Sequence, residues 1–340
     1  MNNSDACILA IESSCDDTSA ALLKGHRVLS NVIANQLVHQ KYGGVIPELA
    51  SRSHQKNILP VVETALKDAH TDISEVDAIA YTQGPGLPGS LIVGSAFSKS
   101  LSMALNVPLI EVNHMQAHIL AHFIEGVHQE PPAFPFICLT VSGGHTQMVL
   151  VKSHFDMKII GSTIDDAAGE AFDKIAKLLG LDYPGGPLVD KLAQEGDASR
   201  FEFSKAKVDG YNYSFSGLKT SVLYFLKKSI EEDHLFVEKN RSDLCASVQA
   251  NIVEVLMQKL EKASFDHDID NIAMAGGVSA NSGLRKALLQ RQETLNWKTY
   301  VPPIAYCTDN AAMIGITGHF KFIEASFSGL GSIPSARLKF

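Results

Sequence analysis

The sequence has few cysteines, and none of them stands in a paired motif. Its five cysteines are widely spaced, their number is odd, and no Cys-x-x-Cys pair occurs. This usage favours a reducing compartment. Long apolar runs are also absent: the first run, residues 6–11, is short and is followed at once by Glu12. Neither a signal peptide nor a membrane span is expected, so we predict a cytoplasmic protein with no membrane partner.

Basic residues are fewer than acidic residues in this sequence. The chain has 29 Lys and Arg against 37 Asp and Glu, which gives a net charge of −8. Because phosphate binding draws on clustered basic side chains, this balance argues against a protein that coats nucleic acid unaided. A local basic patch remains compatible with it, and the candidate is residues 205–219 with Lys227 and Lys228 nearby. Composition alone favours a solvated surface there.

Tryptophan is also scarce, with a single residue, but the other proportions are ordinary. The sequence is 45% hydrophobic and 19% charged, which is typical of a globular enzyme and far from disordered or fibrous classes. A length of 340 residues exceeds the usual size of one domain. Two domains, or one large domain with two lobes, are therefore expected.

A hairpin pattern occurs twice along the chain. A polar or Gly-rich turn separates two apolar runs in each copy, at residues 7–12 and 20–23 and again at 136–141 and 148–151. A shift of 128 positions carries Thr18 onto Thr146 and Ser14 onto Ser142. Both matches fall in the turn, and each hairpin opens a half of comparable length. We interpret the pattern as an internal duplication.

Helical and strand-like patterns alternate after each hairpin. Helices are predicted at 48–69, 90–105, 169–179 and 243–263, and strands at 78–81, 109–112 and 272–275. Such alternation predicts an α/β sheet fold. Residues 126–135 hold three prolines and a glycine and are predicted to connect two lobes. We expect an N-terminal lobe of residues 1–131 to which 310–340 return, and a C-terminal lobe of residues 132–309.

Residues 84–89, GPGLPG, fit the dinucleotide motif G-x-G-x-x-G between a strand and a helix, with Glu111 downstream. Dinucleotide loops hold pyrophosphate with backbone N–H groups, however, and Pro85 and Pro88 lack that donor. Pro88 suits the start of a helix near Ser90. We therefore disfavour NAD or FAD binding here. The P-loop motif G-x-x-x-x-G-K-[ST] does not occur.

Two other Gly-rich turns follow buried-looking strands, SGGHT at residues 142–146 and GGVSAN at 276–281. Small residues there let a backbone approach a ligand closely. Either turn alone is more often an ordinary tight turn. Together with YPGGP at residues 183–187, they leave a nucleotide site and plain turns as equal alternatives.

Acidic residues gather near these turns, where carboxylates commonly position a cation or polarise a hydroxyl. The group consists of Asp16, Asp17, Asp165, Asp166, Glu170, Asp173 and Asp190. Capping of a helix N-terminus is the stronger interpretation for Asp165 and Asp166. Asp173 lies three residues after Glu170 on nearly the same helix face, which is compatible with a ligand role.

The stretch VNHMQAHILAHF, residues 112–123, places three histidines at intervals of four. On a helix His114 and His118 share one face and can bind one metal ion together. His122 lies about 12 Å along the axis from His114, whereas metal–nitrogen bonds are about 2 Å long, so it cannot join them. The third protein ligand must come from elsewhere, and an acid within residues 307–310 is one candidate. Taken alone, such histidines are more often surface or core residues.

A zinc protease of the H-E-x-x-H type has its general base directly after the first histidine. That position is Met115 in this sequence. The pattern therefore has the ligand spacing of a metalloprotease without its base, and it disfavours hydrolysis.

Nine motifs together resemble the successive signatures of the TsaD family, the bacterial branch of the tRNA threonylcarbamoyladenosine enzymes. They extend from Ile11 to about Ile314 in the order of the family. The motifs are IESSCDDTSAAL, GPGLPGSL, NHMQAH, TVSGGHTQ, DDAAGEAFDK, YPGGP, SFSGLKTS, AGGVSAN and YCTDNAAMI.

The resemblance implies an α/β, two-lobed fold of the actin, hexokinase and heat-shock ATPase (ASKHA) superfamily, built from duplicated RNase H-like units. It also implies transfer of the threonylcarbamoyl group from threonylcarbamoyl-AMP to the exocyclic amine of adenosine 37 in tRNAs that read codons starting with A. AMP is then released. Because this fold does not determine the chemistry, a small-molecule kinase or ATPase is the alternative, followed by an inactive scaffold and, last, a metalloprotease.

The resemblance also implies site residues. A divalent metal, iron before zinc, is expected on His114, His118 and Asp309. Asp16 and Asp17 are expected to organise the site or handle a proton, although many members have Glu where this chain has Asp17. Thr140 stands where archaeal and eukaryotic relatives have a Tyr metal contact. The adenylate is expected to lie against Thr140, Val141, Ser142, Gly143, Gly144, Asp173, Gly186, Asp190 and Asn281.

Partners are implied in the same way. A TsaB-like homologue is expected to pair with the N-terminal lobe, a TsaE-like ATPase to act with it, and a TsaC-like enzyme to supply threonylcarbamoyl-AMP. The acidic net charge fits a chain that does not capture tRNA alone. The predicted helices at 48–69 and 90–105 are the expected docking surfaces.

Overall fold

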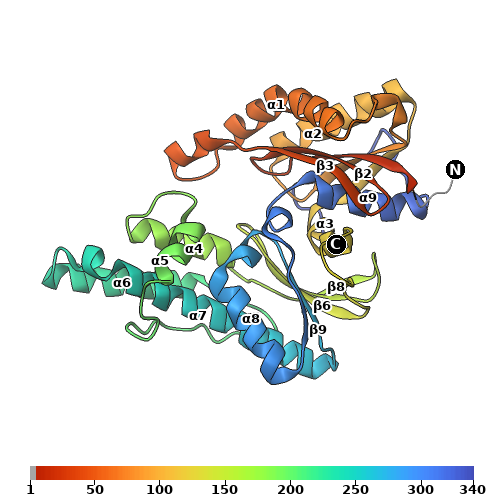
Figure 1. Ribbon diagram of the computed structural model, residues 1–340. Coiled ribbons are helices and arrows are strands. Elements are labelled where there is room, and N and C mark those ends of the chain that lie inside the picture. The colour runs from red at the N-terminus through yellow and green to blue at the C-terminus, as the bar shows by residue number, and fades with distance from the viewer. Residues whose placement is uncertain (1–4) are drawn as a thin grey trace. The chain divides into compact units, whose positions relative to one another are not determined.

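The computed structural model describes residues 5–340, which form two compact units (Figure 1). Unit 1 contains the chain up to residue 131 together with residues 302–340, and unit 2 contains residues 132–301. Residues 302–309, which we assigned to the C-terminal lobe from the sequence, pack with unit 1 instead. Asp309 therefore belongs to the same unit as the two histidines that it is expected to join.

Unit 1 is built on a five-stranded mixed sheet with the strand order β3-β2-β1-β4-β5. Strand β1 pairs antiparallel with β2 and parallel with β4, and all six of its residues are buried. A central strand covered on both faces explains why its sequence is an apolar run rather than an alternating pattern. The strands are β1 (Cys7–Glu12), β2 (Thr18–Lys24), β3 (Arg27–Ala34), β4 (Ala78–Gly84) and β5 (Leu109–Asn113).

Helices cover both faces of this sheet. Helices α1 (Pro47–Asp68) and α2 (Pro88–Leu105) contact β2, β3 and β4, whereas α9 (Ala311–Ile323) lies on the other side against β1, β2 and β4 (Figure 1). The first ten residues of α9 are all buried. At Gly318 a Cβ atom would lie 2.6 Å from the Cβ of Ala80, so the glycine is what lets α9 approach the sheet.

Unit 2 repeats the topology of unit 1, with the strand order β10-β9-β6-β7-β8. Strand β6 takes the place of β1, because it pairs antiparallel with β7 and parallel with β9. The strands are β6 (Phe136–Val141), β7 (Thr146–Val151), β8 (Met157–Ser162), β9 (Asn271–Ala275) and β10 (Lys298–Tyr300). The helices are α4 (Ala168–Leu178), α5 (Gly185–Ala193), α6 (Ser216–Glu232), α7 (Phe236–His267) and α8 (Ser282–Leu295).

The duplication that we predicted from the hairpins is confirmed by this shared topology, and the predicted shift of 128 positions matches the pairing register of the two hairpins. Thr18 and Thr146 both begin the second strand of their hairpin, as the shift of 128 positions requires. The same shift carries the pair Glu12–Ser19 of the first hairpin onto the pair Thr140–Gln147 of the second. Ser14 therefore occupies the same place as Ser142, as predicted, and the second hairpin only has one further pair at its turn, Val141 with Thr146.

The GPGLPG segment forms a structural turn between β4 and α2. The backbone N–H of Leu87 donates to the carbonyl of Ser14 at 2.7 Å, and that of Gly86 donates to the carbonyl of Ala336 at 3.3 Å. These amides are engaged by the protein itself and cannot hold a pyrophosphate, which agrees with the interpretation against a dinucleotide. Helix α2 begins at Pro88, two residues before the predicted start. Within residues 5–340 no helix is both long and apolar enough to span a membrane.

Candidate metal and nucleotide sites

His114 and His118 take their places from the junction between β5 and the short helix α3 (His114–Leu120). Asn113 ends the strand and caps the helix, since its side chain accepts hydrogen bonds from the backbone N–H groups of Met115 and Gln116, at 2.9 and 3.2 Å. His114 is therefore the first helical residue, and His118 lies one turn further on the same face. Both side chains are buried.

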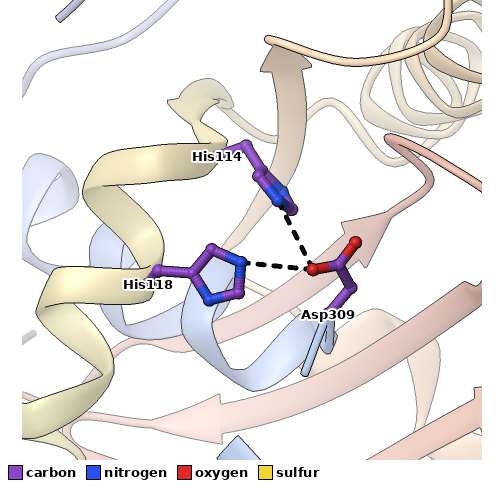
Figure 2. A group of neighbouring side chains, drawn as sticks. All are labelled: His114, His118 and Asp309. Carbon is purple, nitrogen blue, oxygen red and sulfur yellow. Dashed lines mark hydrogen bonds and ion pairs between the residues drawn. The ribbon is translucent and has the colours of Figure 1, made fainter. Parts of the chain in front are cut away.

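Asp309 completes a compact group with these two histidines (Figure 2). Its Oδ1 atom lies 3.2 Å from Nε2 of His118 and 3.5 Å from Nε2 of His114. The three ligand atoms lie within 4.8 Å of one another. Asp309 directly precedes α9, whose N-cap Asn310 accepts a hydrogen bond from the N–H of Met313 at 3.1 Å. The capped helix start thus holds the carboxylate in front of the histidines.

A second carboxylate, that of Glu12, supports His114 from the opposite side. Its Oε2 atom lies 3.0 Å from Nδ1 of His114 and accepts the hydroxyl of Thr82 at 2.6 Å. With Nδ1–H donating to Glu12, the lone pair of Nε2 faces Asp309, which is how a histidine ligand is commonly oriented for a metal. We did not single out Glu12 from the sequence. The available signal was an acidic residue at the end of an otherwise apolar, buried strand.

The electrostatics of this group favour a positive charge between the carboxylates. Burial opposes a charged imidazole, but Glu12 and Asp309 together raise the pKa of His114 well above its ordinary value. Burial likewise opposes charge on Asp309, yet His114 and His118 bring the pKa of its carboxyl well below the usual range. A cation stabilises two carboxylates that face the same imidazole, here the buried Glu12 and the partly buried Asp309.

The donor set fits a divalent metal ion. Two imidazole nitrogens and one carboxylate oxygen match the ligand types of zinc and of non-haem iron sites, and three protein ligands leave coordination positions open. Within the described part of the chain, Nδ1 of His118 is a buried atom without a hydrogen-bond partner. His118 therefore has only its Nε2 atom, which faces Asp309, committed to a polar contact.

His122 does not belong to the group. Helix α3 ends at Leu120, and His122 lies in the 3-10 turn Ala121–Phe123 that follows, so the three histidines do not share one α-helix. Its Nδ1 atom lies 2.8 Å from Nε2 of His128, and the two rings stack with centroids 5.1 Å apart. The prediction that His122 cannot join the pair agrees with this geometry.

Asp16 and Asp17 lie half-buried in the turn between β1 and β2. Burial, together with the negative charges of Asp16, Asp309 and Glu12, raises the pKa of Asp17 to about 7. A carboxyl group with this pKa can hold or release a proton near neutral pH. Asp17 therefore has the proton affinity that an acid–base role at this site requires.

Unit 2 gathers the Gly-rich turns at the carboxyl ends of β6 and β9. The turn after β6 is closed by the backbone N–H of Ser142, which donates to the carbonyl of His145 at 2.8 Å. Gly143 and Gly144 have open space where a side chain would stand. A Cβ on Gly169, in the first turn of α4, would lie 2.5 Å from the carbonyl oxygen of Ser142. Helix α4 therefore packs directly against this turn.

The polar residues expected around a nucleotide form two clamps in the same unit. Oδ1 of Asp173 accepts the N–H groups of Gly185 and Gly186, at 2.8 and 3.1 Å, and so holds the start of α5 against α4. The carboxylate of Asp190 accepts the hydroxyl of Ser282 at 2.7 Å, which ties α5 to the start of α8.

Asn281 caps α8 and also reaches α7. Its side-chain oxygen accepts the N–H of Leu284 at 2.9 Å, and its side-chain nitrogen donates to Oε1 of Gln249 at 2.7 Å. Gly276, at the other end of this loop, has a φ of +85°, and a Cβ there would lie 2.5 Å from the carbonyl oxygen of Val141. The loop therefore lies against the end of β6, next to Thr140.

Asp165 caps a helix, as the sequence interpretation favoured, but not the one that follows it. Its carboxylate accepts the N–H of Phe215 at 2.8 Å and the hydroxyl of Ser216 at 2.7 Å, at the start of α6. Burial raises the pKa of Asp165, but the hydrogen bonds from Ser214, Phe215 and Ser216 together outweigh it and lower the pKa. Asp166 instead pairs with Lys174 of α4 at 2.7 Å.

Comparison with known proteins identifies close relatives along nearly the whole chain. The family model described as TsaD, tRNA N6-adenosine threonylcarbamoyltransferase, matches residues 27–316. A protein of that name from Riemerella anatipestifer is 59% identical over 97% of both chains, and one from Christiangramia forsetii is 58% identical over 100% of both. A third, from Porphyromonas gingivalis, is 55% identical over 98% of both chains.

Solved structures show the fold. The HypF protein of T. kodakarensis matches 97% of this chain and 50% of its own with a TM-score of 0.63 at 13% identity. The ROK hexokinase of Thermus thermophilus matches 94% of this chain and 99% of its own with a TM-score of 0.50 at 14% identity. At such identities the likeness concerns the fold alone. The α/β fold is of the ASKHA type, as expected.

Proposed function

Because the chain belongs to the tRNA N6-adenosine threonylcarbamoyltransferase family, we propose that it transfers the threonylcarbamoyl group of threonylcarbamoyl-AMP to tRNA. The acceptor is the exocyclic amine of adenosine 37 in tRNAs that read codons starting with A, and AMP is released. The enzyme is a transferase that modifies a tRNA adenosine. One observation carries the proposal beyond the family name: the family's expected ligands His114, His118 and Asp309 come together, although they lie far apart in the sequence.

We propose that these three residues hold one divalent metal ion, iron before zinc. When bound, such an ion would act as a Lewis acid that polarises the carbamoyl carbonyl. Glu12 keeps the Nε2 lone pair of His114 available because its carboxylate accepts a hydrogen bond from Nδ1–H of the same ring. Because the aryl amine of adenosine is a weak nucleophile, activation of the electrophile contributes more than a strong base does.

Asp17 is our candidate for the base that accepts the proton lost by the attacking amine. Its pKa of about 7 lets it accept that proton at neutral pH and return it to solvent. Asp16 supports this role by raising the proton affinity of its neighbour.

We propose that unit 2 binds the AMP part of the substrate. Thr140, Val141 and Ser142 end β6, and Gly143 and Gly144 leave open space for a phosphate or ribose to approach the backbone. Asp173, Gly186, Asp190 and Asn281 would contact the ribose and base. Support for this assignment comes from the hydrogen bonds that fix these groups on α4, α5 and α8.

We also propose that the enzyme works with a TsaB-like homologue and a TsaE-like ATPase in the cytoplasm, where its tRNA is found, and that a TsaC-like enzyme supplies threonylcarbamoyl-AMP. Helices α1 and α2 present exposed apolar side chains that suit a protein partner. These are Leu59, Ile92 and Met103, which are 53%, 58% and 65% exposed.

A reconstitution tests the proposed function. The purified chain is combined with its TsaB-like and TsaE-like partners, threonylcarbamoyl-AMP and unmodified tRNA, and the nucleosides are analysed by mass spectrometry. We expect threonylcarbamoyladenosine to form with iron or zinc and to disappear in the Asp309→Ala variant. Absence of product with every metal supplied, or full activity of the variant, would contradict the proposal.

A further inference from the structure

Unit 2 carries a concentration of lysines that the proposed chemistry does not use. Between residues 205 and 228 there are five lysines against a single acidic residue, Asp209, in a chain whose net charge is −8. This segment is therefore strongly basic within an acidic protein. We call the five lysines, together with Tyr224, the α6 lysine surface: Lys205, Lys207, Lys219, Lys227 and Lys228.

Helix α6 (Figure 1) packs one side into the core of unit 2 and leaves the opposite side exposed. Leu218, Val222 and Leu226 recur every four residues and are buried. Lys227 projects from the side opposite this apolar stripe at 100° per residue, next to Tyr224, which is 66% exposed. The exposed half of the helix therefore combines cationic side chains with an accessible aromatic ring.

The segment before the helix brings two more lysines to the same element. The rings of Phe201 and Phe225 lie 5.3 Å apart, and the backbone N–H of Ser204 donates to the hydroxyl of Ser221 at 3.3 Å. Residues 201–204 are thus bound along α6. Lys205 and Lys207 follow directly and are exposed.

None of the five lysines forms an ion pair among the described residues, although Glu231 and Glu232 lie one helical turn beyond Lys227 and Lys228. As far as residues 5–340 are concerned, no ion pair or hydrogen bond engages the ammonium groups of these lysines, whereas Lys174 and Lys239 of the same unit pair with Asp166 and Asp233 at 2.7 Å. The start of α6 does not supply an anion site of its own, because Asp165 already accepts its first N–H groups. An anionic ligand would bind through the lysine side chains.

We propose that the α6 lysine surface binds the phosphate backbone of the tRNA substrate. This inference rests on the proposed function, which requires a polyanion to dock on an acidic protein. Clustered, unpaired lysines attract phosphates and release counterions from them, and an exposed tyrosine can stack on an unpaired base. A small anion would engage one or two such side chains, whereas five along a helix and its lead-in segment match a repeating phosphate chain.

The test compares two triple variants of the full chain in complex with its partners. The first is Lys205→Ala, Lys227→Ala and Lys228→Ala. The second is a control that removes the same charge from the same unit, Lys152→Ala, Lys158→Ala and Lys298→Ala. These three lysines are also exposed and unpaired within the described residues, but they lie outside the α6 lysine surface. The dissociation constant for unmodified tRNA is measured at several salt concentrations.

We expect the first triple variant to bind tRNA at least about tenfold more weakly at low salt and to lose about 3 from the slope of log K against log salt. The control should retain the wild-type slope. The KM for threonylcarbamoyl-AMP and kcat at saturating tRNA should be unchanged in both variants. Replacing the same three lysines by arginine should preserve binding, which separates lost charge from a folding defect.

Equal slopes for the two alanine variants would overturn the proposal. It would also be overturned if the first variant bound tRNA normally but no longer eluted with its protein partners, because the surface would then be a protein interface. Failure of the wild-type complex to form threonylcarbamoyladenosine would contradict the proposed function itself. The tRNA binding comparison would still decide the role of the lysines in that case.

Discussion

Nδ1 of His114 lies 3.0 Å from Oε2 of Glu12, and both side chains are buried. This contact joins the end of the central strand β1 to the first residue of α3. It favours the ring orientation in which Nε2 faces Asp309, so the metal affinity that we propose for the cluster should depend on Glu12, which is not itself a ligand.

Replacement of Glu12 by Gln should weaken metal binding. The neutral amide keeps a similar shape but no longer stabilises positive charge on the His114 ring, and loss of such an outer partner commonly costs about 10- to 100-fold in metal affinity. Titration of the metal-free protein against a chelator of known affinity measures the change. Glu111→Gln removes a carboxylate of the same unit that lies outside the cluster, and its metal affinity should equal that of the wild type. Equal affinities of the two variants would refute a role for Glu12.

His118→Ala and His122→Ala should separate a ligand from a structural histidine. Both side chains are buried, so both variants should be less stable, by about 1–3 kcal/mol each. Only His118→Ala should lose bound metal, because His122 contacts His128 rather than the cluster. Metal content by mass spectrometry, taken beside thermal unfolding, distinguishes the two effects. A loss of metal in His122→Ala that matched the loss in His118→Ala would contradict our assignment.

Local patterns in the sequence were enough to predict the histidine pair, because the spacing of one helical turn is a property of the chain itself. They were not enough to select Asp309, which lies 191 residues from His118 and left the third ligand open until the family resemblance was considered. Glu12 was missed for a related reason. Its function arises from a contact between strand and helix over 102 residues, and no local periodicity records such a contact.

The fold was predictable to a similar extent. The longer helices and the central strands were found because their apolar residues recur regularly, but α7 begins seven residues before its predicted start. Helices α5, α6, α8 and α9 and the strands β3, β8 and β10 were not predicted. Residues 27–34 and 157–162 form outer strands that are only partly buried, so their apolar patterns are weak. Asp165 shows the same limit, since it caps a helix 50 residues further along the chain.

Asp17→Asn should lower kcat if Asp17 handles the proton of the attacking amine. General acid–base residues typically contribute about 10²- to 10⁴-fold, and we expect a loss within that range under saturating substrates. Asp17→Glu keeps a carboxylate at this position and should keep most of the activity. Asp16→Asn is the matched control, with a smaller expected loss. The assignment fails if Asp17→Asn and Asp16→Asn have the same kcat.

His319 should make the stability of unit 1 sensitive to acid. Burial, with a contribution from His26, lowers the pKa of His319 to about 4, well below its ordinary value of 6.5. The unfolded chain therefore takes up a proton at this position before the folded chain does. The stability that neutral His319 contributes is fully present above pH 6.5 and is lost as the pH falls from 6.5 towards 4.

The variant His319→Phe, which keeps an aromatic ring beside His26 and Phe320, removes this titration. Urea unfolding at pH 7 and pH 5 should show a smaller loss of stability on acidification in the variant, by at most about 1.4 kcal/mol for each pH unit below 6.5. Parallel losses in the two proteins would show that His319 is not responsible.

Asp173→Ala should weaken the binding of AMP to unit 2. The variant removes the acceptor for the N–H groups of Gly185 and Gly186, so the start of α5 is no longer held against α4 and two partly buried donors lose their partner. Isothermal titration with AMP should show a loss of about tenfold, equivalent to about 1.4 kcal/mol. Glu170→Ala removes a partly exposed carboxylate from the same helix, one that pairs with Lys174 at 2.8 Å rather than with the start of α5. The AMP affinity of this variant should match that of the wild type. If Asp173→Ala bound AMP as tightly as Glu170→Ala, the clamp at the start of α5 would have no part in nucleotide binding.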